Sequence, residues 1–536
     1  MSVVPNATNA PNARNSNIGW ISGERLDGLL LSLTVAIAGI LFWIAPRPAM
    51  VDVPQHAAQV ALFRDLIAGT SHWSDLVRIN YFTPYLIGYG LALALSVAMP
   101  ILTAMKLVMM LAFFGYVAAG FKLCDEFKAD RRLRWLCVPG FFGFVYQWGF
   151  YTFLIATPLA FLFLIVAHRF ARSSGISGGF LLCLAGVGLF FSHGLVFLFA
   201  CAVGAAFIPC FRKTPGQIVA ALAPYAVLGL LALTYFVALH HNDLLVPEAV
   251  GDEVNGAAWD WSDPYGWHRS FTFLGYTVAT TAQDWYFSLG AVFLLVAPWL
   301  MGARLNRRDP SAFAMIAALV IIWFGVPAVA LGTAALYHRF AIFLLPAYAL
   351  IFREPTPDEK LASSRRPQWL DPASFVRTAV VLFCWAYLCV LGVREYQFAQ
   401  ESAPFETVLD AAEPDQRALS LVLEPGSSVI HNGYTYLHYP LWYQVEKGGF
   451  VDFNFAVFLP EIVRFRSDRL PAQMRQLILD RPEAFDWYAV QGRTYRYFFV
   501  HHTEPLPAGM FKNDECEVAL VKGAGEWSLF ERRACR

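Results

Sequence analysis

The sequence predicts an α-helical polytopic membrane protein with about eleven transmembrane helices and a small C-terminal α+β domain. Of the 536 residues, 57% are hydrophobic and only 15% are charged, whereas a soluble domain carries about 25% charged residues. Apolar runs of roughly the 20 residues that cross a bilayer recur as far as residue 393. Beyond this point the polarity is that of a soluble domain. The formal net charge is zero, which gives no indication of nucleic-acid binding.

Residues 1–25 are rich in Asn, Ala and Pro, and we expect them to form a disordered cytoplasmic tail. The first apolar run then begins a transmembrane domain that we assign to residues 26–394. Its expected spans are Gly28–Ala45, Ile101–Lys122, Leu133–Trp148, Phe150–Ala167, Ile176–Phe191, Leu195–Phe211, Ile218–Leu239, Trp285–Met301, Ala312–Thr333, Tyr337–Phe352 and Phe375–Val393.

One further apolar run, Pro84–Met99, decides the side on which every later loop lies. If it does not cross and the N-terminus is cytoplasmic, the cytoplasmic loops hold sixteen Lys and Arg residues, and the opposite loops up to residue 336 hold four. This asymmetry follows the positive-inside bias, so we expect the run to lie along the membrane or to re-enter it. Residues 46–100 then form a first periplasmic loop with juxtamembrane helices, residues 240–284 a second, and residues 395–536 a periplasmic domain. The expected location is the inner membrane of a bacterium.

The C-terminal domain shows a mixed secondary-structure pattern. Its segment from residue 431 to 442 is dense in aromatic and imidazole groups, which we expect to form core or docking surface. Cys516 and Cys535 could form a disulfide if the domain is periplasmic, but the sequence leaves this open. Strands are expected at Ser427–Ile430, Asp486–Val490 and Tyr495–His501, and a helix at Leu470–Asp480.

The segment after the first span holds the candidate catalytic residue, Asp52. His56 follows four residues later, and Pro54 fits the start of a helix between them. Both side chains are expected at the water–lipid boundary, where a carboxylate can take the proton of a hydroxyl that attacks an activated sugar. The alternative is that Asp52 only caps the helix Gln55–Ala68.

A single span followed by a long outer loop that opens with an acidic residue resembles the GT-C superfamily of membrane glycosyltransferases. The superfamily includes protein O-mannosyltransferases and the aminoarabinose transferases of lipid A. The resemblance implies that the acidic residue acts as the base and that the donor is a polyprenyl-phosphate-linked sugar. Asp52 is the only position that matches. Residues 28–352 are also similar to uncharacterised bacterial membrane proteins that share an Asp-x-Pro-x-His loop, a Trp-Gly-Phe segment (Trp148–Phe150) and a Ser-His pair (Ser192-His193).

The superfamily's frequent acidic pair is absent, because Val51 and Val53 flank Asp52. We therefore assign no metal ligands and no cofactor, and leave dependence on a divalent metal open.

Polar residues at the periplasmic ends of other spans are expected to line the same cavity. Arg339 is the candidate for the donor phosphate, because a guanidinium binds phosphate oxygens in a bidentate manner; the alternative is snorkelling to the interface. Trp259 and Trp261 could stack on a sugar, with interfacial anchoring as the alternative. The remaining substrate-binding candidates are His56, Lys106, Tyr146, Gln147, His193 and His338.

The sequence therefore predicts an inverting glycosyltransferase that moves a sugar from a polyprenyl-phosphate donor to a periplasmic or envelope acceptor. The donor sugar, the oligomeric state and the nature of the acceptor (glycan, lipid or protein) are not specified. The alternatives are a transporter or flippase of a lipid-linked glycan and a non-catalytic partner in polysaccharide assembly. A flippase is expected to carry charged residues along several spans, and these spans are poor in charge.

Overall fold

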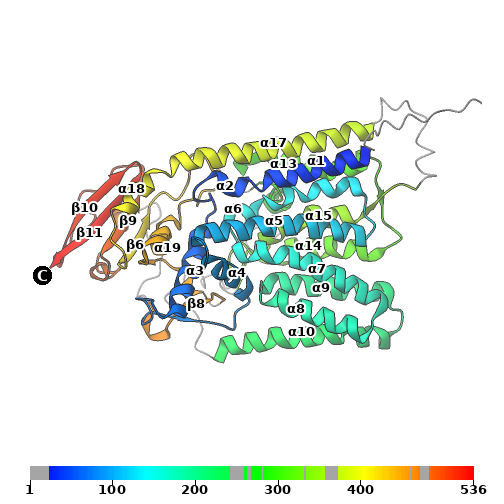
Figure 1. The fold of residues 1–536 in the computed structure, drawn as a ribbon, viewed down its shortest axis with the longest axis horizontal. Coiled ribbons are helices and arrows are strands. Elements are labelled where there is room, and N and C mark those ends of the chain that lie inside the picture. Colours follow the sequence, from blue (N-terminus) through cyan, green and yellow to red (C-terminus); the bar gives the residue numbers. More distant parts are fainter. Residues whose placement is uncertain are drawn as a thin grey trace, which may run out of the picture.

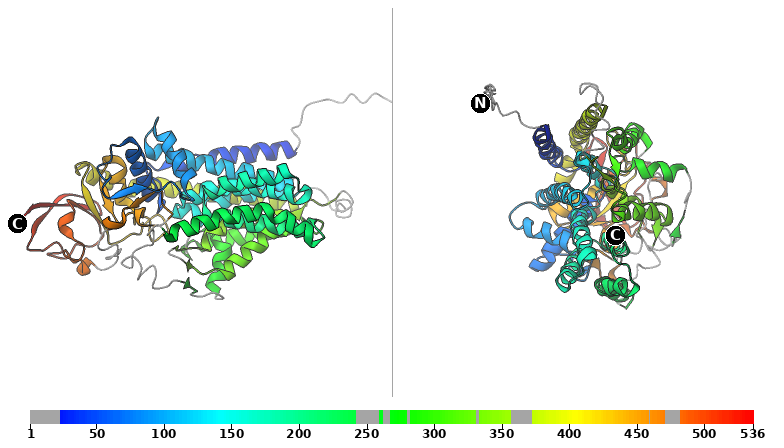
Figure 2. Two further views of the ribbon diagram at one scale, coloured as in Figure 1. Left: turned by 90° about the horizontal axis from the view of Figure 1, so that it is seen from below. Right: turned by 90° about the vertical axis from the view of Figure 1, so that its right-hand side faces the viewer.

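The computed structural model describes residues 23–241, 259–261, 267–279, 282–330, 333–356, 372–458, 460–470 and 482–536. Its helices form an elongated bundle, and the C-terminal residues form a sheet-containing region at one end of it (Figure 1). We call residues 395–536 the tail and this end of the bundle the tail end. Two further views show the same separation between the helices and the tail (Figure 2).

Within the described residues, six helical segments are long and apolar enough to cross a membrane. The window within α7 is the most buried of the six, at 78%, and that within α10 the least, at 11%. α7 therefore lies at the centre of the bundle and α10 at its edge. The six are Arg25–Ile44 (α1, Gly23–Ala38, with α2, Leu41–Ile44), α5 (Ile101–Glu126), α7 (Tyr151–Ser173), α9 (Gly194–Phe211), α10 (Pro215–His241) and α17 (Pro372–Glu401).

The shorter apolar helices are α4 (Leu86–Ser96), α8 (Ile176–Phe190), α13 (Trp285–Leu300), Pro310–Gly325 with α14 (Ala314–Gly325), and His338–Leu350 with α15 (Leu344–Leu350).

The expected span Leu133–Trp148 is not one continuous helix, which corrects the prediction. It forms two 3-10 segments, Arg131–Cys137 and Pro139–Phe141, followed by α6 (Phe144–Trp148). Pro139 has no N–H to donate, and Gly143 packs directly on backbone: a Cβ there would lie 2.4 Å from the carbonyl oxygen of Thr277. Local hydrophobicity could not reveal this interruption, because its cause is a contact with a distant segment.

Loops that were predicted to share the cytoplasmic side gather at the end opposite the tail. The strand β3 (Arg304–Leu305) pairs with β5 (Phe352–Arg353), and Asp130 N–H donates to the carbonyl of Phe352. α1 begins at this end too, because the Asp27 carboxylate accepts a hydrogen bond from Trp135. The grouping of these loops is the one expected if Pro84–Met99 does not cross the bundle.

The first loop forms α3 (Val53–Ala68), β1 (Val77–Ile79) and α4 at the tail end. α4 has 11 residues, and a helix of this length rises about 16 Å, roughly half the hydrocarbon thickness of a bilayer. The Ile87 N–H donates to the carbonyl of Phe191 at 2.9 Å, which ties α4 to the turn between α8 and α9.

The tail contains a five-stranded sheet in the order β10-β11-β9-β6-β7. β6 (Arg417–Val422) is parallel to β7 (Phe450–Asp452) and β9 (Tyr497–His501), whereas β11 (Trp527–Cys535) is antiparallel to β9 and β10 (Cys516–Ala524). A disulfide between Cys516 and Cys535 joins β10 to β11.

The predicted strand at Tyr495–His501 is confirmed by β9, but two other predicted strands are wrong. Ser427–Ile430 is a loop, because the Ser427 hydroxyl and the Ser428 N–H bond to the carboxylate of Glu401. Asp486–Val490 is a turn in which Asp486 accepts from the following N–H groups. The predicted helix Leu470–Asp480 lies, from residue 471, outside the described residues.

The tail shares a hydrophobic core with the first loop. β8 (Val463–Phe465) pairs antiparallel with β1, and α19 (Trp442–Lys447) packs against α3. Arg47 is buried at this junction, where it forms ion pairs with Glu406 and with Glu446 and lies over the rings of Phe405 and Trp442. The guanidinium thus links the end of the first span to two tail helices, α18 (Pro404–Asp410) and α19.

Replacing Arg47 by Ala is expected to lower the free energy of unfolding by about 1–3 kcal/mol, because charge-assisted hydrogen bonds at a buried site are lost. The melting temperature of the purified protein and the rate of proteolytic release of the tail measure this effect. The control is Arg64→Ala, which removes a partly exposed pair with Asp65 and should cost less than about 1 kcal/mol. Equal effects of the two changes would contradict the role given to Arg47.

Candidate functional site

Asp52 lies at the tail end, where the first span ends and α3 begins. Its N–H donates to the carbonyl of Trp148 at 2.9 Å. This contact depends on Gly149, which has φ +72° and leaves no room for a side chain: a Cβ there would lie 3.0 Å from the side chains of Met50 and Val53. The Trp-Gly-Phe segment noted in the sequence therefore fixes the backbone beside Asp52.

The side chain of Asp52 does not cap α3. The residue occupies the N-cap position, yet its carboxylate makes no capping hydrogen bond, so capping does not explain it. The residue is 8% exposed, and burial raises the pKa of its carboxyl to about 7, while the charge of Arg339 acts in the opposite direction. A carboxyl group with a pKa near neutrality can accept a proton in the physiological range.

His438 of the tail approaches Asp52, and the hydrogen bonds around Gln55 define its tautomer. The Gln55 Oε1 accepts from the Phe455 N–H at 2.9 Å, so its amide nitrogen faces the Phe453 carbonyl and Nδ1 of His438, at 3.0 and 3.1 Å. An amide nitrogen only donates, which places the His438 proton on Nε2. This atom lies 3.5 Å from Oδ1 of Asp52. Burial lowers the pKa of His438 to about 3, so the ring is neutral.

His56 lies one helical turn beyond Asp52 and takes part in a second set of hydrogen bonds. Its Nδ1 is 2.7 Å from the hydroxyl of Tyr89 on α4, which in turn bonds to the carboxyl of Glu461 from the tail. All three side chains are buried. Burial first, and then the charge of Arg339, lower the pKa of His56 to about 3.

Arg339 supplies the positive charge of the site. Its guanidinium lies 3.9 Å from the ring centre of Phe150, and Nη2 donates to the carbonyl of Ala334 at 3.1 Å. Its Nε is buried and has no hydrogen-bond partner among the described residues. The carboxyl groups of Asp52 and Glu461 both lie within electrostatic range of this guanidinium. The site thus combines two buried carboxyl groups with a cation that retains a free donor.

The structure therefore brings together Asp52, His56 and Arg339 from the predicted set. His193 lies within electrostatic range of Arg339 and His56, but its Nδ1 accepts from the Leu195 N–H and so begins α9. That contact is structural, and it leaves Nε2 as the only ring atom available to a substrate.

Four other predicted residues make contacts of a different kind. Tyr146 packs in a cluster of phenylalanine rings, with Phe142 at 5.0 Å. His338 stacks on Tyr337 at 3.8 Å. Lys106 donates to the carbonyl of Ala45 at 2.6 Å, which braces the end of the first span. Gln147 contributes a backbone carbonyl that accepts from the Val51 N–H at 3.4 Å. A role in substrate binding remains a prediction for each of them.

The tryptophans of the long loop lie at the edge of the described part of that loop. Trp259 belongs to the two-residue strand β2 (Trp259–Asp260), which pairs with β4 (Val329–Ala330). Trp261 is exposed. Residues 242–258 and 262–266 of this loop lie outside the described residues, so the stacking of Trp259 and Trp261 on a sugar stays a prediction.

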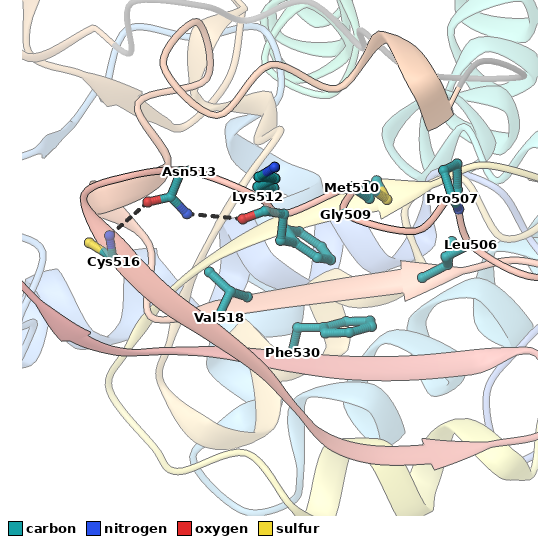
Figure 3. A pocket seen from close by; sticks show the side chains of 10 residues that line it. Leu506, Pro507, Gly509, Met510, Lys512, Asn513, Cys516, Val518 and Phe530 are labelled. Atoms are coloured by element: carbon teal, nitrogen blue, oxygen red, sulfur yellow. Dashed lines mark hydrogen bonds between the residues drawn. The ribbon is translucent and has the colours of Figure 1, made fainter.

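No group of three or more His, Cys, Asp or Glu side chains within the described ranges is arranged to hold a metal ion. A separate hollow occurs on the tail, beside the disulfide (Figure 3). Apolar side chains such as Leu506, Met510, Val518 and Phe530 line it, and none of the predicted site residues does.

The architecture is that of an integral-membrane protein with a buried acidic site at one end of its helix bundle. A solved structure with a similar fold is that of ArnT from Cupriavidus metallidurans bound to undecaprenyl phosphate. The match covers 95% of this chain and 98% of ArnT, with a TM-score of 0.52 and 10% sequence identity. No family model matches the chain, and no curated protein matches it.

Three residues of the site were not singled out from the sequence. His438 lies in the segment that was expected to be core or docking surface, and its contact with Asp52 also places it in the candidate site. Glu461 had one faint signal, because it is the only carboxylate in the largely apolar stretch 453–463. Tyr89 had none, since a tyrosine on an apolar helix is typical of an interfacial anchor.

Proposed function

We propose that the protein transfers a sugar from a polyprenyl-phosphate donor to a hydroxyl group of an envelope acceptor. The observation that carries this proposal is the buried carboxyl of Asp52, held beside a guanidinium with a free donor at one end of a GT-C-type bundle. The likeness to ArnT, whose structure contains undecaprenyl phosphate, supports a lipid-linked donor. The positive-inside distribution of Lys and Arg supports a periplasmic position for the tail end.

In this mechanism Asp52 accepts the proton of the acceptor hydroxyl as its oxygen attacks the anomeric carbon. The bond between that carbon and the phosphate oxygen breaks, and the electron pair leaves with the polyprenyl phosphate. Arg339 stabilises the developing phosphate charge through its guanidinium, including the donor at Nε. Attack from the face opposite the phosphate inverts the anomeric configuration.

The N–H at Nε2 of His438 faces the Asp52 carboxylate, and we assign this histidine to orienting the base. A neutral imidazole suits this role, because a second fixed cation beside Arg339 would lower the pKa of Asp52 and weaken it as a base. His56 is assigned to the sugar, as argued below.

The test uses the full-length protein in lipid nanodiscs with a panel of polyprenyl-phosphate monosaccharides and an envelope extract as acceptor. Mass spectrometry follows the release of free polyprenyl phosphate and the gain of sugar by the acceptor. Release by the wild type but not by Asp52→Asn supports the proposal. Equal release by both proteins overturns the role of Asp52. Movement of the donor between leaflets without release, or no reaction with any donor, overturns the enzymatic function in favour of a flippase or a non-catalytic partner.

A further inference from the structure

Glu461 is held rigidly against the first loop, although it belongs to the tail. The segments that flank it are tied to that loop: the Asn80 N–H donates to the carbonyl of Ile462 at 2.7 Å, and the Thr83 hydroxyl donates to that of Pro460. The side chain of Asn80 also donates to the backbone carbonyl of Glu461 at 3.1 Å. These bonds continue the β1–β8 pairing and direct the glutamate toward the site.

The carboxyl of Glu461, the hydroxyl of Tyr89 and the ring of His56 form a chain of hydrogen bonds across three separate elements. An ionised carboxylate only accepts, so the Tyr89 O–H donates to it at 2.5 Å. The tyrosine oxygen is then free to accept, so the proton of the neutral His56 ring lies on Nδ1, at 2.7 Å. The other ring nitrogen, Nε2, is left with a lone pair and has no hydrogen-bond partner among the described residues.

We propose that Glu461, acting through Tyr89, positions His56 so that its Nε2 accepts a hydrogen bond from a hydroxyl of the transferred sugar. This inference rests on the proposed function and adds a positioning residue to the same site. A sugar hydroxyl is the matching partner, because it donates one hydrogen bond in a fixed direction and carries no charge. His56 lies one turn of α3 beyond Asp52, and its N–H donates to the Asp52 carbonyl at 3.0 Å, so the two side chains lie on the same side of the helix start.

Protonation of Glu461 reverses the direction in which these hydrogen bonds are donated. A protonated Glu461 donates to Tyr89, Tyr89 donates to Nδ1 of His56, and Nε2 then carries the proton and can no longer accept. Burial, with a smaller contribution from the charge of Asp52, raises the pKa of Glu461 to about 8; the Tyr89 hydrogen bond and the charges of Arg464 and Arg339 oppose this rise. The form of His56 that accepts is therefore favoured as the pH increases through 8.

Tyr89→Phe tests the chain of hydrogen bonds with little change of shape, because it removes only the linking hydroxyl. We expect the turnover number for sugar transfer to fall about ten- to a hundredfold. The KM for the lipid carrier should stay unchanged, because Arg339 binds its phosphate. The control is Tyr151→Phe, since Tyr151 also packs against the ring of His56 but donates to the carbonyl of Gly88. Equal losses in the two variants would show a general packing effect and overturn the proposal.

Glu461→Gln tests the pH dependence. The wild-type transfer rate should increase with the deprotonation of two groups, near pH 7 for Asp52 and near pH 8 for Glu461. The Glu461→Gln variant should retain only the step near pH 7. The role of Glu461 is overturned if the wild-type pH profile shows no second deprotonation step. It is also overturned if the Glu461→Gln variant retains that step.

A third measurement does not depend on transfer. Solid-state NMR of ¹⁵N-histidine-labelled protein, with the His56 signals assigned from His56→Asn, reports which ring nitrogen carries the proton. The proton should move from Nε2 to Nδ1 between pH 7 and 9 in the wild type, and neither Tyr89→Phe nor Glu461→Gln should show this change. An unchanged tautomer in the wild type overturns the proposed chain of hydrogen bonds. A tautomer change in a wild-type protein that transfers no sugar with any donor overturns the proposed function and the sugar hydroxyl at Nε2.

Discussion

Asp52→Asn is expected to reduce the rate of sugar transfer by about 10²- to 10⁴-fold, because general-base catalysis contributes an effect of this size. Asparagine has the same shape, and its side-chain oxygen can still accept from Nε2 of His438, so the fold should persist. The rate of polyprenyl-phosphate release by the purified variant measures the loss. The control is Asp65→Asn, which neutralises a partly exposed carboxylate on the same helix, α3, and should leave the rate unchanged.

The same variant is expected to be at least as stable as the wild type at pH 8. The Asp52 carboxyl has its pKa raised in the folded protein from 3.8 to about 7. The unfolded chain therefore releases this proton first, and stability falls as the pH rises from about 4 to 7. The whole pKa shift corresponds to a loss of at most about 4 kcal/mol in the free energy of unfolding. Asparagine removes this cost. A lower melting temperature for Asp52→Asn than for the wild type at pH 8 would indicate a structural role instead.

Arg339→Gln is expected to reduce the transfer rate by about 10²- to 10³-fold, the usual effect of removing one group that stabilises developing negative charge. It should also raise the KM for the lipid donor, because the guanidinium that binds the phosphate is lost. Arg339→Lys restores the charge but not the bidentate geometry, so a partial recovery is expected. The control is Arg169→Gln, which removes an exposed guanidinium paired with Glu126 at the opposite end of the bundle.

The pH profile of Arg339→Gln gives a second measurement of the same contact. The charge of Arg339 lowers the pKa of Asp52, so its removal should raise this pKa above about 7 and shift the rise in activity to higher pH. Part of the lost rate should then return in alkaline solution. An unshifted profile would show that the two groups do not interact.

The grouping of the basic loops at one end of the bundle and the position of Pro84–Met99 could be predicted because charge distribution and hydrophobicity act locally. The loops rich in Lys and Arg gather at one end of the bundle. The run Pro84–Met99 forms a helix too short to span a bilayer. The interruption at Pro139 and Gly143 could not be predicted, because the run from Leu133 to Trp148 is almost uniformly apolar and its break depends on contact with the backbone of Thr277.

For the candidate base, Asp52, the sequence also predicted one part and left another part open. Asp52 and His56 are four residues apart and follow the first span directly, so their shared position was evident from spacing. Whether Asp52 capped a helix or remained available to a substrate was left open, because both require the same residue at the same place. The absence of a capping hydrogen bond excludes the capping alternative, and contact of Asp52 with a substrate stays a prediction.

By itself, the sequence predicted that the chain is a polytopic membrane protein with a polar C-terminal tail, and which acidic residue opens the loop after the first span. These properties follow from local solvation, since each apolar or charged segment partitions according to its own composition. Only the tertiary structure decided that His438 and Glu461, about 400 residues away from Asp52 in the chain, complete the site. The physical reason is that the tail and the first loop share one hydrophobic core and a strand pairing, and no local pattern encodes which distant polar groups such packing encloses.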